Sequence, residues 1–103
     1  MGATQIKIVS EIKNIVKKIK LDADFEWAWS NVGRCYFRKG FKTIANMSLD
    51  FQDGHLTASF KRGETKSEYF GNNDKIFYIE YTKGDDIINF LNFVKTNLKG
   101  RVS

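Results

Sequence analysis

The sequence from residue 44 to residue 61 reads IANMSLDFQDGHLTASFK. Apolar and polar residues alternate on both sides of Asp53-Gly54, a residue pair favoured in two-residue type I′ hairpin turns. Such a turn places Phe51 opposite Leu56, and every further apolar pair then falls on the same face as this one. Because pattern, turn and register agree, this stretch predicts an antiparallel β-hairpin with one apolar face and one polar face.

The polar face of this hairpin carries mostly short polar side chains, which is typical of a sheet face that meets water. Its residues are Asn46, Ser48, Asp50, Thr57, Ser59 and Lys61. We therefore expect the helices of the fold to cover the opposite, apolar face of the sheet.

Two segments on either side of the strand-rich region have the apolar spacing of amphipathic helices. The repeating positions are Ile8, Ile12, Ile15 and Ile19 in the first segment, and Ile87, Leu91, Val94 and Leu98 in the second. We expect the first helix to cover residues 4–20, with Thr4 as its N-cap. The second helix is expected to begin at Gly84-Asp85-Asp86 and to stop at Gly100.

Short runs rich in aromatic and β-branched residues predict the remaining strands of the sheet. These strands are Phe25–Trp29, Arg34–Arg38, Ile76–Tyr81 and a candidate edge strand at Lys66–Phe70. A turn at Asn31 and Gly33 is expected to separate the first two, and Lys39-Gly40 is expected to form the next turn.

These elements predict one α+β domain over residues 1–103. It is a two-layer sandwich, with an N-terminal helix, an antiparallel sheet of four to six strands and a C-terminal helix. Both helices are expected on one face of the sheet. The strand order stays open at this point, because the first strand can pair with either the second or the last.

The composition bounds the class of protein. With 103 residues, 42% of them hydrophobic and none of them proline, the chain is long enough for one packed domain and too short for two. Cys35 is the single cysteine, so no intrachain disulfide forms, which fits a reducing compartment. No apolar run approaches the roughly 20 residues of a membrane helix. We expect a cytoplasmic protein with no membrane partner.

Catalytic and metal-binding patterns are weak in this sequence. Cys35 and His55 are the only cysteine and histidine, and they lack the spacing of a zinc site or of a nucleophile–base pair. Glu64 and Lys66 have the E-x-K spacing of metal-dependent nucleases, with Asp50 upstream, but they sit at a glycine turn rather than within a strand. We therefore expect neither an enzyme nor a cofactor.

The cations carry a more specific pattern than the formal net charge of +5. The Asp53-Gly54 turn defines one end of the hairpin, which leaves the positions after Phe60 at the opposite end. If Lys39-Gly40 is also a turn, five cations come to that same end of the sheet. They are Arg38, Lys39, Lys42, Lys61 and Arg62. Such a cluster predicts a binding surface for an anionic partner, although charged turns are common in any domain.

Four aromatic residues are candidate interface anchors, because exposed tryptophan and tyrosine often anchor protein contacts. They are Trp27, Trp29, Tyr36 and Phe41. Trp27 and Trp29 alternate with other residues on one short strand, so packing under the helices is the competing and stronger interpretation for these two.

The sequence thus predicts a small non-enzymatic module that binds another protein, of the inhibitor, immunity or adaptor type. The alternative is a nucleic-acid-binding protein that uses the basic edge of the sheet. The predicted open sheet face disfavours the stacking mode of single-strand binding, because it displays asparagine, serine, threonine and aspartate rather than aromatic rings.

Overall fold

The predicted hairpin forms the centre of the sheet in the computed structural model, which describes residues 2–63 and 75–102. Strands β3 (Lys42–Gln52) and β4 (His55–Arg62) pair with Phe51 opposite Leu56 and Met47 opposite Phe60. The predicted register is therefore confirmed. The turn is not of type I′, because that type needs positive φ at both central residues and only Gly54, at 79°, has it.

The sheet is an antiparallel meander. Its other strands are β1 (Asp22–Trp27), β2 (Val32–Lys39) and β5 (Lys75–Glu80), in the order β1-β2-β3-β4-β5. The open question of strand order is settled, since β1 pairs with β2 and not with the last strand. Among the described strands, β1 and β5 lie at the two edges of the sheet. The candidate strand at 66–70 lies outside the described residues.

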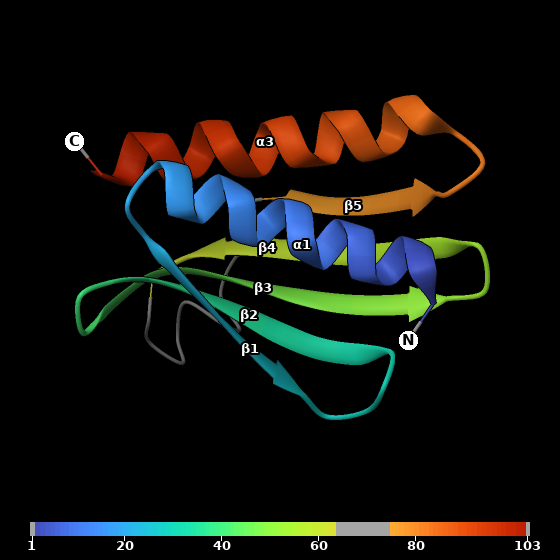
Figure 1. Ribbon diagram of the computed structural model, residues 1–103, viewed down its shortest axis with the longest axis horizontal. Helices are drawn as coiled ribbons and strands as arrows, with labels where there is room; N and C mark the ends of the chain where they lie inside the picture. The colour runs from blue at the N-terminus through green and yellow to red at the C-terminus, as the bar shows by residue number, and fades with distance from the viewer. Residues whose placement is uncertain (1, 64–74, 103) are drawn as a thin grey trace.

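Helices α1 (Ala3–Lys18) and α3 (Gly84–Val102) lie on the same side of the sheet (Figure 1). Their apolar residues form one core with the inward-facing strand residues, and Ile12, Phe60 and Phe90 in this core are completely buried. The ring of Phe77 on β5 packs edge-on against Phe90 of α3. The predicted α+β fold with both helices on one face is thus confirmed.

Other local expectations are also wrong, including the strand expected at Phe25–Trp29, which runs from Asp22 to Trp27. The N-cap of α1 is Gly2 in an extended conformation, not Thr4, and α3 continues past Gly100. Asn46 lies on the open face but is buried, and its amide nitrogen donates to the carbonyl oxygen of Gly63 at 3.3 Å. Gly33 is not in a turn but in β2, opposite Trp27.

Gly33 is required by the close approach of Trp27. A Cβ atom at this position would lie 2.5 Å from the indole ring of Trp27 and 2.7 Å from the backbone oxygen of Glu26. We expect Gly33→Ala to lower the free energy of unfolding by about 1–3 kcal/mol, because ring and backbone must both shift. Urea denaturation followed by circular dichroism checks this. Unchanged stability would show that Trp27 moves aside freely.

Candidate anionic-partner site at one end of the sheet

The turn between β2 and β3 projects an aromatic ring between two lysines. Lys39 pairs with Lys42 at the ends of the two strands, and Gly40 and Phe41 form the turn. Gly40 has a φ of 65°, which glycine adopts at little cost. Phe41 is fully exposed, at 105% of its reference area. An exposed phenylalanine between cations has no packing role in the domain.

The end of β4 brings two further cations to the same end of the sheet. Lys61 lies opposite Asn46, and Arg62 lies opposite Ala45. The backbone N–H of Gly63 then donates to the carbonyl oxygen of Ile44, which continues this ladder. The five cations expected from the sequence are therefore gathered at one end of three adjacent strands.

Cations from other elements extend this cluster. α1 ends beside the start of β1, whose Asp22 pairs with Arg38 of β2, and α3 ends near Arg62 because Gly100 and Arg62 line one small hollow. β5 also begins at this end (Figure 1). We define the basic pole as the five sheet cations Arg38, Lys39, Lys42, Lys61 and Arg62 together with Lys17, Lys18, Lys20, Lys75 and Lys99.

Part of the basic pole has a structural cause. The carbonyl end of a helix carries a partial negative charge, so Lys17 and Lys18 in the last turn of α1 stabilise that helix. Lys39, Lys42 and Lys75 lie on strands, so the helix ends do not account for their charge, and the ammonium group of Lys75 lies 5.5 Å from the ring centroid of Phe77. The favourable interaction with helix ends therefore does not explain the positive charge on the sheet portion of the basic pole.

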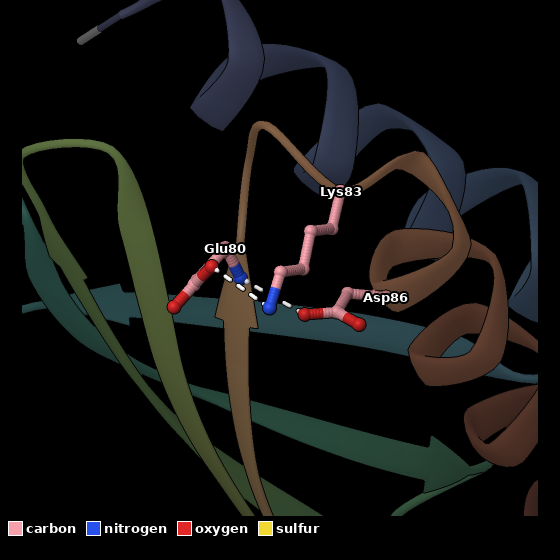
Figure 2. A network of polar contacts seen from close by, with 3 residues as sticks. All are labelled: Glu80, Lys83 and Asp86. Atoms are coloured by element: carbon pink, nitrogen blue, oxygen red, sulfur yellow. Dashed lines mark hydrogen bonds and ion pairs between the residues drawn. The ribbon is translucent and has the colours of Figure 1, made fainter.

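The opposite end of the molecule is acidic. The backbone N–H of Tyr81 donates to the carbonyl oxygen of Gly54, which joins the end of β5 to the β3–β4 turn. This acidic end carries Asp50, Asp53, Glu80, Asp85 and Asp86. Figure 2 shows one network there, in which the ammonium group of Lys83 lies 3.2 Å from the carboxylate of Glu80.

Separation of charge along the molecule gives it a polarised field. Near the basic pole, the carboxylate of Asp24 lies 3.7 Å from the guanidinium of Arg38, at a distance typical of a weak surface ion pair. The field of the remaining cations can orient an approaching anionic partner over about 10 Å at moderate salt. The charge distribution thus favours approach through the end that carries Phe41.

The four candidate aromatics occupy different environments. Trp27 points into the core, where its ring stacks on Phe25 with centroids 6.1 Å apart. Trp29 lies beyond the end of β1 and is 71% exposed, so it is not packed under the helices as a strand residue would be. Tyr36 is half-buried on the open face, 5.5 Å below the guanidinium of Arg38. Among the described candidates, only Phe41 combines full exposure with a position beside cations of the basic pole.

The candidate catalytic residues are not brought together. Cys35 lies in the core, whereas the ring of His55 packs on Tyr78 on the open face at a centroid distance of 4.8 Å. In residues 2–63 and 75–102, no three His, Cys, Asp or Glu side chains form a group that could hold a metal ion. Glu64 and Lys66 lie outside these ranges, so the E-x-K interpretation has no structural test.

Burial makes Cys35 a poor nucleophile. Burial and, secondarily, the negative charge of Asp24 raise the pKa of its thiol, against the opposing effect of Lys13. We expect iodoacetamide to label Cys35 slowly in the folded protein and rapidly in urea, because only the thiolate reacts. Because the pKa of the thiol is raised in the folded protein, this group leaves the free energy of unfolding unchanged below its unfolded pKa of about 8.5. Above that pH the free energy of unfolding should fall, since the unfolded state loses its proton first. Equal labelling rates with and without urea would contradict this burial.

Sequence analysis missed the part of the pole contributed by α1, β5 and α3. The lysines concerned are visible in the sequence, but their convergence depends on strand order, which the sequence left open. Sequential strands pair more often than not, and applying this tendency would have predicted the meander and with it the convergence of these lysines.

No protein-family model, curated protein or solved structure gives a significant match to this chain. No helix in the described part of the chain has the length and apolar character needed to cross a bilayer.

Proposed function

We propose that this protein is a non-enzymatic binding module that recognises an acidic surface of another protein through the basic pole. The observation that carries the proposal is the fully exposed ring of Phe41 between Lys39 and Lys42. An aromatic anchor that enters an apolar pocket, surrounded by charged contacts, is a recurrent arrangement in protein interfaces. An inhibitor, immunity protein or adaptor would use such a surface.

A nucleic acid is the second candidate partner, and the number of cations at the basic pole favours it. Contacts to phosphates require cations but no projecting phenylalanine. The open sheet face also offers few rings for base stacking, since the exposed Tyr78 and the half-buried Tyr36 are separated by strands β3 and β4. Recognition of an acidic protein therefore accounts for more of the surface than recognition of a phosphate backbone does.

We also propose a cytoplasmic location for this protein. A single buried thiol, with no disulfide in the domain, suits a reducing compartment, and we place the protein in the cytoplasm. Partners there include acidic proteins and nucleic acids, so the experiment must separate the two.

A comparison of two anionic probes across a salt series separates the candidates. The probes are poly-L-glutamate and duplex DNA of matched charge, titrated against the labelled protein and its Phe41→Ala variant. A protein-directed surface should prefer the polypeptide. Poly-L-glutamate has no apolar pocket for Phe41, so Phe41→Ala should weaken binding to neither probe, which checks that the cations carry it. Tighter binding to DNA, with a steep salt dependence, would support the nucleic-acid candidate instead.

A further inference from the structure

The hydrogen-bonding direction of β5 can be read from its neighbours. The N–H of Tyr81 donates to Gly54 O at 2.8 Å, in continuation of the pairing between β5 and β4. Backbone groups in an antiparallel pair face alternately toward and away from the partner strand. Lys75, Phe77 and Ile79 therefore direct their N–H and C=O groups to β4. The groups of the intervening residues point to the outer edge of the sheet.

One end of this outer edge is already capped. The N–H of Glu80 donates to a carboxylate oxygen of Asp86, at 3.2 Å, in the first turn of α3 (Figure 2). Lys83 pairs with the side chain of Glu80 at the same place. Within the described residues, the outward backbone groups of Ile76 and Tyr78 have no such cap. These two residues, which alternate with Phe77 and Ile79, therefore carry the uncapped outward groups between Lys75 and Glu80.

The side chains beside this segment are unusual for a sheet edge. Ile76 and Tyr78 lie on the open face and are 60% and 61% exposed. At the other edge, the open-face side chains of β1 are Asp22, Asp24 and Glu26. Charged residues along an edge discourage the addition of another strand, and exposed apolar residues do not. The sheet therefore has one protected edge and one unprotected edge.

We infer that the edge of β5 accepts an extended segment of a protein partner, which pairs with Ile76 and Tyr78 as an additional strand. Two N–H and two C=O groups at strand spacing are matched by the backbone of an extended chain. Apolar or β-branched side chains of that segment would pair with Ile76 and Tyr78 across the strands. The capped N–H of Glu80 sets the end of the pairing.

The position of α3 selects between a partner segment and a second copy of this chain. α3 packs on β5 through Phe77, Phe90 and Phe93 and lies along β5 on the side away from β4 (Figure 1). A second copy pairing through its own β5 would bring its α3 into the space that α3 of the first copy already occupies. A segment without a helix over its edge avoids this collision.

The test uses a capped peptide with the sequence of β5, KIFYIE, as the probe, because this sequence adopts a strand here and carries no helix. Backbone amide NMR spectra of the full chain are recorded during titration. We expect the largest shifts at the amides of Ile76 and Tyr78, together with slower hydrogen exchange there. In the free protein these two amides should exchange faster than those of Phe77 and Ile79.

A proline variant isolates the backbone contribution. Ile76→Pro removes an outward N–H and leaves the bonds to β4 intact, a position where edge strands tolerate proline. We expect it to weaken peptide binding roughly tenfold, as the loss of one hydrogen bond with its steric clash implies. Ile76→Val keeps the N–H and should bind as the parent does, with unchanged thermal melting in both variants.

Three outcomes would overturn the inference: shifts confined to the basic pole, equal binding by Ile76→Pro and the parent, or a dimer in sedimentation that Ile76→Pro abolishes. The last outcome would assign the edge to a second copy. Substitutions at Lys39 and Lys42 should leave peptide binding unchanged, so failure here is distinguishable from failure of the proposed function.

Discussion

Reversing two charges beside Phe41, with Lys39→Glu and Lys42→Glu together, is expected to weaken binding to poly-L-glutamate roughly a hundredfold at low salt. Each substitution removes one favourable surface charge contact and adds one unfavourable contact, and such contacts are worth up to about 1 kcal/mol each. The effect should shrink as salt is added, because exposed charges are screened. Fluorescence anisotropy of the labelled protein measures it.

A matched control separates position from total charge. Lys7→Glu with Lys83→Glu changes the formal net charge from +5 to +1, as the first pair does, but both residues lie outside the basic pole. Lys7 is in the first half of α1 and Lys83 is at the acidic end. If the two double variants lose affinity equally, binding follows net charge and the basic pole is not a site.

The largest effect on stability is expected at Phe60. This side chain is completely buried and touches Phe37 and Phe93, with ring centroids 6.4 Å and 5.4 Å away. Phe60→Ala should lower the free energy of unfolding by about 3–5 kcal/mol, because it removes a large apolar side chain and leaves a cavity beneath α3. Urea denaturation at equilibrium measures the change.

Phe41→Ala is the matched control for this stability prediction. It removes the same side chain from a fully exposed turn, so the free energy of unfolding should stay within about 0.5 kcal/mol of the parent value. A loss at Phe60 below about 1 kcal/mol would contradict the tight packing between β4 and α3. A comparable loss at Phe41 would show that its ring packs against the domain.

The sheet centre and the helices were predictable because local and global signals agree there. Asp53-Gly54 fixes a two-residue turn, and a shift of one residue would turn Phe51 and Leu56 to the wrong face. The two helices follow from their apolar spacing alone. Helix ends were less predictable, since Gly2 caps α1 by its extended backbone and Lys20 ends it with a φ of 61°.

The wrong expectations come from positions where tertiary packing decides. Gly33 has the sequence appearance of a turn residue, but it lies in β2, where the absence of a side chain leaves room for the ring of Trp27. Asn46 alternates correctly to the open face, yet it is buried and bonded to Gly63. Alternation specifies a face of the sheet and cannot specify what lies against that face.

The candidate site was predictable to the extent that it depends on turns. Lys39-Gly40 and Asp53-Gly54 together place Arg38, Lys42 and Lys61 at one end of the sheet, and the structure has them there. The exposure of Phe41 depends on which segments far apart in sequence approach the β2–β3 turn, and no local pattern contains that information.

Photo-crosslinking from position 41 tests the proposed recognition most directly. p-Benzoylphenylalanine replaces Phe41 in one sample and Ile88, an exposed residue of α3, in a control sample, and both are irradiated in nuclease-treated extract of the source cells. We predict that position 41 alone gives a protein adduct, mapped by mass spectrometry to an acidic segment, and that Lys39→Glu with Lys42→Glu abolishes it. Nucleic-acid adducts before nuclease treatment, or equal adducts from positions 41 and 88, would contradict recognition of an acidic protein through the basic pole.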